Sequence, residues 1–83
     1  MPEEKINVYG TEWCGDCFRV RQFLKRNSIP FTFINIDRDK DAEKFVLETN
    51  RGMRSVPTIV FGDGTILVEP SNQELSVKLG VGV

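Results

Sequence analysis

The residues best suited to chemistry are two cysteines, which lie in the segment Trp13-Cys14-Gly15-Asp16-Cys17. The chain has two cysteines and no histidine, which excludes Ser-His and Cys-His nucleophile pairs and most zinc sites. A disulfide across so short a loop constrains the unfolded chain little, so stability is a poor reason for the pair. In a reducing compartment, close cysteines more often catalyse redox chemistry or bind a metal.

The position of the pair predicts a different role for each thiol. The cysteines follow a β-prone run at residues 6–9 and open a run with helical periodicity at residues 14–26. A helix N-terminus carries partial positive charge and unpaired N–H groups, so a thiol there is stabilised as a thiolate. Cys14 is therefore predicted to be the nucleophile. Cys17 lies one turn further, on the apolar face, and is predicted to resolve a disulfide formed at Cys14.

The elements that must position this pair alternate between strands and helices. A second β-prone run covers residues 31–37, and a second amphipathic helix follows Asp39 and ends near Gly52. A helix between two strands permits a parallel crossover, which is right-handed in about 98% of cases. The first half of the chain thus predicts an α/β layered sheet.

The second half of the chain predicts a hairpin and a last helix. Residues 58–61 and 65–68 are β-prone and flank a Gly-Asp-Gly turn, which favours antiparallel pairing. Residues 71–74 have the spacing of a capping box. We expect Arg19 and Arg21 to form a solvated helix face; the alternative is that one of them attracts an anionic thiol substrate. The aromatic residues expected in or near the core are Phe18, Phe23, Phe31, Phe33, Phe45 and Phe61.

Size and charge limit the remaining functions. The 83 residues give room for one domain, residues 1–83. A net charge of -1 and a pI of about 5.4 provide no basic stripe for nucleic acid or anionic lipid. The start, Met1-Pro2-Glu3-Glu4-Lys5, is acidic and unlike a signal peptide, and no apolar run approaches membrane-spanning length. We therefore expect a cytoplasmic protein with no nucleic-acid or membrane partner.

A proline before the third strand completes the pattern. Ser55-Val56-Pro57-Thr58 follows the cysteines by about forty residues and leads into residues 58–61. With the cysteine pair, the hairpin and the last helix, the chain resembles the glutaredoxin branch of the thioredoxin-like fold over nearly its whole length. The resemblance implies the order βαβ-α-ββα, with a four-stranded mixed sheet flanked by three helices.

Within that branch, the chain looks most like the mycoredoxin-type small redoxins. The segments that carry this likeness are residues 13–17, residues 54–58, Asp63-Gly64-Thr65 and Glu69-Pro70-Ser71. Glutathione-using glutaredoxins usually carry Cys-Pro-Tyr-Cys and Gly-Gly-x-Asp-Asp, which this chain lacks. Thioredoxins carry Trp-Cys-Gly-Pro-Cys and a buried aspartate on an earlier strand, whereas residues 6–9 contain no carboxylate. Glutathione, mycothiol and bacillithiol therefore all remain open as the small thiol.

The resemblance also implies a substrate groove. Pro57 would be a cis-proline facing Cys14, and the backbone of Val56 would pair with an extended substrate. Thr11 and Arg54 would flank the groove. Trp13 would shield the thiol and contact partners, although its type and position fit simple surface packing beside the site equally well. The N–H groups of Ser71 and Asn72, at a helix start, would hold a carboxylate of the substrate.

The expected function is thiol–disulfide exchange on protein disulfides or on mixed disulfides of proteins with small thiols. The expected co-substrate is a low-molecular-weight thiol, with no bound cofactor and no metal, and the expected state is a monomer. One alternative is an electron donor to ribonucleotide reductase recycled by thioredoxin reductase, although the Trp-Ser-Gly-Phe segment of those proteins is absent. The other is a dimeric iron–sulfur carrier, since one chain offers too few ligands for a cluster.

Overall fold

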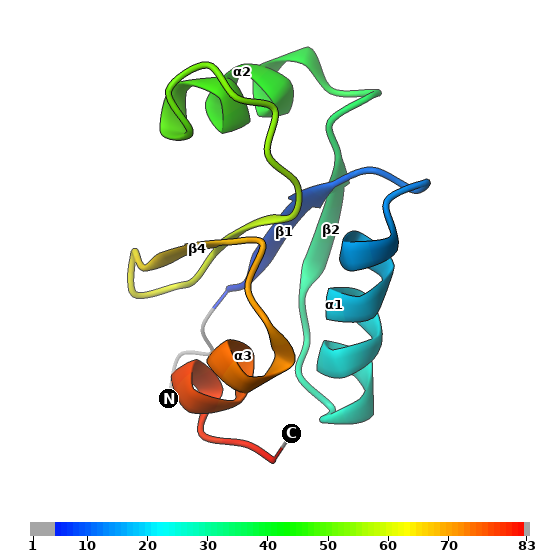
Figure 1. Ribbon diagram of the computed structural model, residues 1–83, viewed down its shortest axis with the longest axis vertical. Helices are drawn as coiled ribbons and strands as arrows, with labels where there is room; N and C mark the ends of the chain where they lie inside the picture. The colour runs from blue at the N-terminus through cyan, green and yellow to red at the C-terminus, as the bar shows by residue number, and fades with distance from the viewer. Residues whose placement is uncertain (1–4, 83) are drawn as a thin grey trace.

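The chain folds into a four-stranded mixed sheet with three helices, as predicted, in a computed structural model that describes residues 5–82 (Figure 1). The elements are β1 (Asn7–Gly10), α1 (Gly15–Arg26), β2 (Thr32–Asn35), α2 (Lys40–Thr49), β3 (Thr58–Val60), β4 (Ile66–Val68) and α3 (Asn72–Leu79). Residues 1–4, on which most of the signal-peptide prediction rests, and residue 83 lie outside the described residues. Within residues 5–82, no helix is long and apolar enough to cross a membrane.

The strands are arranged in the order β2-β1-β3-β4. β1 pairs with β2 in parallel, and α1 forms the crossover between them, as the sequence predicted. β3 is antiparallel to both β1 and β4, which confirms the predicted hairpin. The hairpin turn uses Gly64, whose φ of 90° is readily adopted only by glycine. Because β1 and β2 are parallel, their carboxyl ends lie at the same edge of the sheet.

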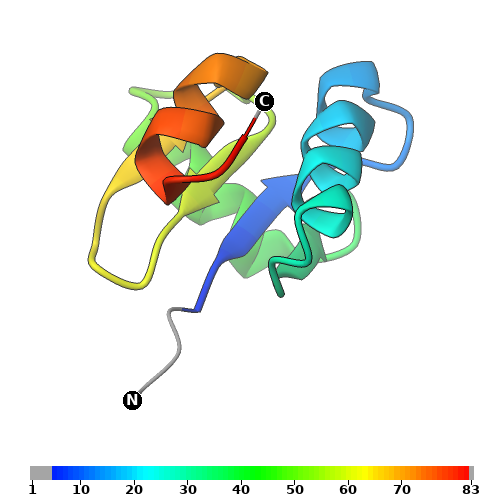
Figure 2. The same ribbon diagram turned by 90° about the horizontal axis from the view of Figure 1, so that it is seen from below.

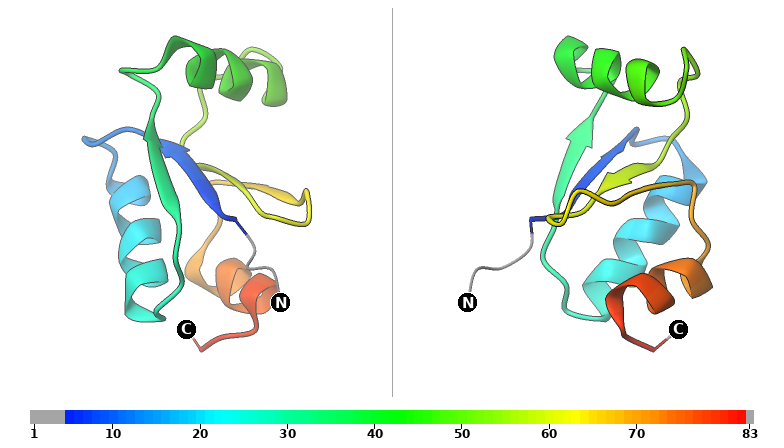
Figure 3. Two further views of the ribbon diagram at one scale, coloured as in Figure 1. Left: turned by 180° about the vertical axis from the view of Figure 1, so that it is seen from behind. Right: turned by 90° about the vertical axis from the view of Figure 1, so that its left-hand side faces the viewer.

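The helices divide between the two faces of the sheet. α1 and α3 cover one face and α2 covers the other (Figures 2 and 3). Side chains alternate along β1, so Val8 packs toward the α1 and α3 face and Tyr9 toward α2. The larger core consists of Ile6, Val8, Val20, Phe23, Leu24, Ile59, Phe61 and Leu75. The smaller core, under α2, consists of Ile36, Ala42 and Val46.

Two predictions of local structure were wrong in detail. Phe18 is 56% exposed rather than in the core, because it is offset from the buried row of α1 that contains Cys17 and Val20. The second strand ends at Asn35 rather than residue 37. There, the Asn35 side-chain oxygen accepts the N–H of Asp37 at 2.9 Å, and this local hydrogen bond turns the chain out of the sheet.

Candidate active site

Cys14 is the N-cap of α1. Its backbone is extended, with φ of -87° and ψ of 121°, and its Sγ accepts the N–H of Cys17 at 3.3 Å. The sequence pattern included Cys14 in the helix, whereas the structure places it just before the first helical residue. The sulfur of a cap residue lies against the positive end of the helix dipole, where negative charge is favoured. Cys14 is half-buried, so its sulfur remains within reach of a substrate.

Cys17 is chemically different because it is completely buried. Burial, followed by the hydrogen bond with Cys14, raises the pKa of its thiol to about 12. The thiol lies directly over Gly10, where an added Cβ would be only 2.5 Å from the Cys17 Sγ. The first strand was predicted over residues 6–9, but the structure extends β1 to Gly10, which packs against this thiol.

The loop before β3 meets Cys14. The Val56–Pro57 peptide bond is cis, as the resemblance implied. The Cys14 thiol donates to the Val56 carbonyl oxygen over 4.0 Å, although the two residues are 42 positions apart. The Thr58 hydroxyl donates to the Ser55 carbonyl at 2.8 Å and braces the loop. This contact places the backbone of Val56 next to the Cys14 sulfur.

Trp13 and Arg54 lie at the surface and share one partner that sequence reasoning missed. The Trp13 indole N–H donates to Asp37 at 2.9 Å, and Arg54 forms an ion pair with the same carboxylate. Arg54 also donates to Glu43 at 2.7 Å. The pKa of Asp37 is held below its usual value, mainly by the hydrogen bond from Arg54 and next by the one from Trp13. The only sequence signal for Asp37 was its position as the last residue of a predicted strand, at the carboxyl edge of the sheet.

Arg19 is not part of a solvated face, so that prediction was wrong. It is half-buried and joins α1 to the start of α3 by donating to the Asn72 Oδ1 at 2.7 Å and to the Pro70 carbonyl at 2.9 Å. It also lies 3.6 Å from the carboxylate of Asp16. The side chain of Asn72 is therefore engaged inside the protein, and the segment before α3 is attached to the helix that carries the cysteines.

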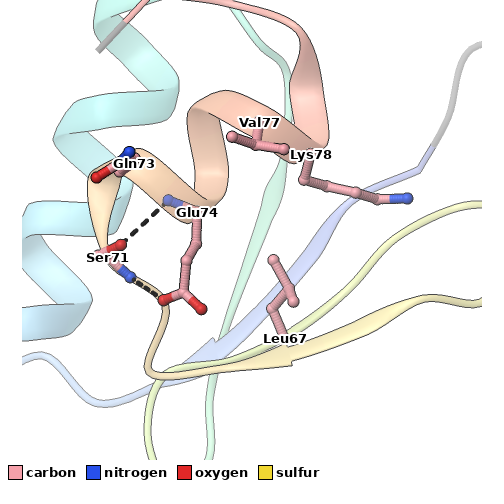
Figure 4. Close-up of a pocket in the computed structure, with 6 residues that line it drawn as sticks. All are labelled: Leu67, Ser71, Gln73, Glu74, Val77 and Lys78. Atoms are coloured by element: carbon pink, nitrogen blue, oxygen red, sulfur yellow. Dashed lines mark hydrogen bonds between the residues drawn. The ribbon is translucent and has the colours of Figure 1, made fainter.

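Ser71 forms the predicted capping box with Glu74. The Ser71 hydroxyl accepts the N–H of Glu74 at 3.1 Å, and the Ser71 N–H donates to the Glu74 carboxylate at 2.8 Å (Figure 4). The structure therefore corrects the expectation that the Ser71 N–H is open to a substrate carboxylate, because a carboxylate of the protein already occupies it. Ser71 instead borders a cavity of about 520 Å³ between β4 and α3. The cavity is lined by Leu67, Ser71, Gln73, Glu74, Val77 and Lys78, and neither cysteine contributes to it.

Thr11 lies beneath the site rather than at its rim. Its side chain is fully buried, and its hydroxyl has no hydrogen-bond partner among residues 5–82. A backbone hydrogen bond from Thr11 reaches Cys17 and favours the charged form of that thiol. The structure therefore corrects the expectation that the Thr11 side chain flanks the groove.

Together, the fold and the site define a redoxin of the thioredoxin-like fold, with a Cys-x-x-Cys pair at the start of the first helix and a cis-proline beside it. The sequence matches the glutaredoxin family model over residues 6–66. The chain belongs to the glutaredoxin family.

Relatives and solved structures agree with this assignment. A Mycobacterium tuberculosis protein named as a glutaredoxin is 39% identical over 74 residues, covering 89% of this chain and 88% of the relative. Mycoredoxin 1 of Corynebacterium glutamicum is 33% identical over 75 residues, covering 89% of this chain and 91% of the relative. The crystal structure of a glutaredoxin from Archaeoglobus fulgidus has a TM-score of 0.71 at 28% identity, covering 89% of this chain and 84% of that one. The crystal structure of a variant of a thioredoxin-like protein has a TM-score of 0.81 at 27% identity, and the match covers 93% of this chain and 96% of that one.

Proposed function

We propose that this protein is a thiol–disulfide oxidoreductase in which Cys14 is the nucleophile and Cys17 the resolving thiol. One observation carries the proposal. The Cys14 sulfur accepts a helix N-terminal N–H and is half-buried, whereas burial keeps the Cys17 thiol protonated with a pKa of about 12. Of the two sulfurs, only Cys14 is therefore placed to attack a substrate disulfide.

The reaction proceeds by two displacements at sulfur. The Cys14 thiolate attacks one sulfur of a substrate disulfide, the S–S bond breaks, and the leaving thiolate takes a proton from solvent. In the dithiol route, Cys17 then loses its proton and attacks the Cys14 sulfur, which releases the second thiol and leaves a Cys14–Cys17 disulfide. In the monothiol route, the mixed disulfide joins Cys14 to a small thiol, and the thiolate of a second small thiol attacks the sulfur of the first. A disulfide forms between the two small thiols, the bond to Cys14 breaks, and the Cys14 thiolate is restored.

The groove beside Cys14 supplies the binding surface in this proposal. The backbone of Val56 pairs with an extended substrate, and the cis peptide at Pro57 presents that backbone to the sulfur. Trp13 and Arg54 form one wall. The α3 start, with Ser71 and Asn72, forms the other, where Arg19 attaches it to α1. Thr11 acts from below, through its backbone contact with Cys17.

The electron source follows from the same proposal. We expect a low-molecular-weight thiol as co-substrate and disulfide-containing proteins as partners, with the protein acting as a monomer in the cytoplasm. A relative is named mycoredoxin 1, which favours mycothiol as the first thiol to test beside glutathione. Bacillithiol and a thioredoxin-reductase-type reductant are the further candidates.

Two cysteine variants test the assignment. Cys14→Ser should abolish reduction of both a protein disulfide and a peptide carrying a small-thiol mixed disulfide. Cys17→Ser should abolish only the dithiol route and retain turnover of the mixed disulfide if the monothiol route operates. Assays that supply electrons through glutathione, mycothiol or thioredoxin reductase, run side by side, identify the reductant. Full activity of Cys14→Ser would disprove the proposal.

A further inference from the structure

Arg21 of α1 is half-buried, although the sequence predicted it to be part of a solvated face. Its guanidinium carbon lies 4.2 Å from the centre of the Phe33 ring on β2, within the range of a cation–π contact. The Nε of the same guanidinium is buried and has no hydrogen-bond partner among residues 5–82. The Phe33 ring therefore holds this cation against the sheet.

Arg21 differs from the two other arginines near the site in having no carboxylate partner. Arg19 lies 3.6 Å from the carboxylate of Asp16, and Arg54 pairs with two carboxylates. None of the ion pairs within residues 5–82 includes Arg21. Its positive charge is therefore not offset by a partner and acts on the titratable groups that lie near it.

The Phe33 ring brings Arg21 close to the thiol of Cys17. A Cβ on Gly10 would lie 2.5 Å from the Cys17 Sγ and 3.3 Å from the Cε1 atom of Phe33, so the sulfur and the ring edge pack over the same residue. Arg21 follows Cys17 by one turn of α1, and residues at this spacing share a helix face. The thiol thus lies at the edge of the ring whose face holds the guanidinium.

The charge of Arg21 favours the thiolate form of Cys17. Burial has the largest effect on the pKa of this thiol and raises it, followed by the hydrogen bond with Cys14, whereas the charge of Arg21 lowers it. The strands place Gly10 and Phe33 against the thiol, and neither titrates. Cys14 stops titrating once it is joined to a substrate, so Arg21 is then the charged group that acts on Cys17.

We propose that Arg21 is a positioning residue for the dithiol route, in which its charge, held against the Phe33 ring, stabilises the Cys17 thiolate during the resolving attack. This inference rests on the proposed thiol–disulfide exchange and deepens it, because it assigns the activation of the resolving thiol. In this step Cys17 loses its proton, its sulfur bonds to the Cys14 sulfur, and the bond from Cys14 to the substrate sulfur breaks. The released thiolate takes up a proton, so charge and protons balance.

The two displacements can be measured separately with dithiodipyridine. This disulfide is uncharged at neutral pH, so Arg21 cannot act on it by attracting an anion. In a stopped-flow experiment with reduced protein, attack by Cys14 releases the first thiopyridone at a rate that rises with reagent concentration. Attack by Cys17 releases the second at a rate that does not. Only the first phase should remain in Cys17→Ser, which assigns the two phases.

Two variants separate the charge of Arg21 from its packing. Arg21→Met removes the charge and keeps an unbranched side chain over Phe33, whereas Arg21→Lys keeps the charge. The second phase should slow about 2- to 5-fold in Arg21→Met, because the thiolate becomes scarcer while its intrinsic nucleophilicity rises and offsets part of the loss. Arg21→Lys should restore most of the second-phase rate. The first phase should keep its wild-type rate in both variants, since Cys17 takes no part in it.

Arg26→Met is the matched control. Arg26 is also on α1 and also lies over an aromatic ring, 6.0 Å from the centre of Phe23, but it is further along the helix from Cys17. This control should change neither phase.

The outcomes separate this inference from the proposed function. A second phase that is unchanged in Arg21→Met, or that slows equally in Arg21→Met and Arg21→Lys, overturns the role of the Arg21 charge and leaves the proposed function standing. Equal slowing of both phases in Arg21→Met also overturns it, because the effect would not then be specific to Cys17. Wild-type protein that releases no first thiopyridone overturns the proposed function and the role of Arg21 with it.

Discussion

Cys14 and Cys17 acquire opposite properties although they are three residues apart. Cys14 caps the helix, where its sulfur accepts a backbone N–H. Cys17 is the first buried residue of the same helix, and its thiol is pressed against the backbone of Gly10. Position along the helix produces this difference, because residues three apart share one face, and on that face Cys14 caps the N-terminus while Cys17 lies one turn further in, among the buried residues of α1.

The buried thiol of Cys17 should make the stability of the reduced protein depend on pH. Between the ordinary thiol pKa of 9.0 and about 12, the unfolded chain releases this proton while the folded chain keeps it. The free energy of unfolding is therefore unaffected by this group below pH 9 and falls as pH rises above it, by up to about 1.4 kcal/mol per pH unit. Urea unfolding with reductant at pH 8, 9, 10 and 10.5 measures the slope.

Cys17→Ala is the control for this pH effect, since it retains all other titrating groups. The variant should lose less stability than the wild type between pH 9 and 10.5. Equal losses in the two proteins would show that Cys17 titrates normally in the folded state.

At the scale of single residues, the sequence predicted the parts of the site that depend on neighbouring residues and missed those that depend on long-range contacts. The roles proposed for Cys14 and Cys17 follow from their positions relative to the start of the helix. Neighbouring residues determine where that helix starts and which of its faces is apolar. The Asp37 contacts were not predictable, because Arg54 is 17 residues away in the chain and the two meet only after the sheet and the cis-proline loop have formed. The prediction of a solvated face for Arg19 was wrong for the same reason, since its partner Asn72 is 53 residues away in the chain.

At the scale of elements, the close packing of β1 against α1 depends on Gly10. A Cβ at this position would lie 2.5 Å from the Cys17 Sγ and 3.3 Å from both the Cys17 Cβ and a Phe33 ring carbon. The element order was predictable from periodicity and turn residues, which are local. This contact was not, because nothing near Gly10 in the sequence indicates which residue of the helix lies above it.

Gly10→Ala should therefore destabilise the protein by about 1–3 kcal/mol, the usual cost of overpacking. Gly15→Ala is the matched control, because Gly15 has no atom within 4 Å of an added Cβ and should gain up to about 1 kcal/mol from helix propensity. In a Cys17→Ala background, Gly10→Ala should cost less, since the sulfur is gone. Urea unfolding of the four variants gives the comparison, and equal costs in both backgrounds would locate the strain elsewhere.

Across the whole molecule, the two faces of the sheet are stabilised unequally. Eight buried residues form the core between the sheet and the helices α1 and α3. The core between the sheet and α2 has only three, and two of them, Ala42 and Val46, belong to α2 itself. A second cavity, of about 350 Å³, lies beside α2 and is bordered by Tyr9, Ile34 and Phe45 among others. Local opening follows the amount of apolar burial, so α2 is the element expected to open first. Because α2 carries Glu43, its opening would also break the ion pair between Glu43 and Arg54.

Native-state hydrogen exchange should show this difference directly. Amides in α2 should exchange at a lower free energy of opening than amides in α1. Val46→Ala should lower protection in α2 with a smaller effect on α1, whereas Val20→Ala, a matched truncation in the larger core, should lower protection throughout, each at a cost of about 1–3 kcal/mol. If Val46→Ala lowers protection equally in α1 and α2, the two faces unfold as one cooperative unit, and the pairing of Arg54 with Glu43 lasts as long as the fold itself.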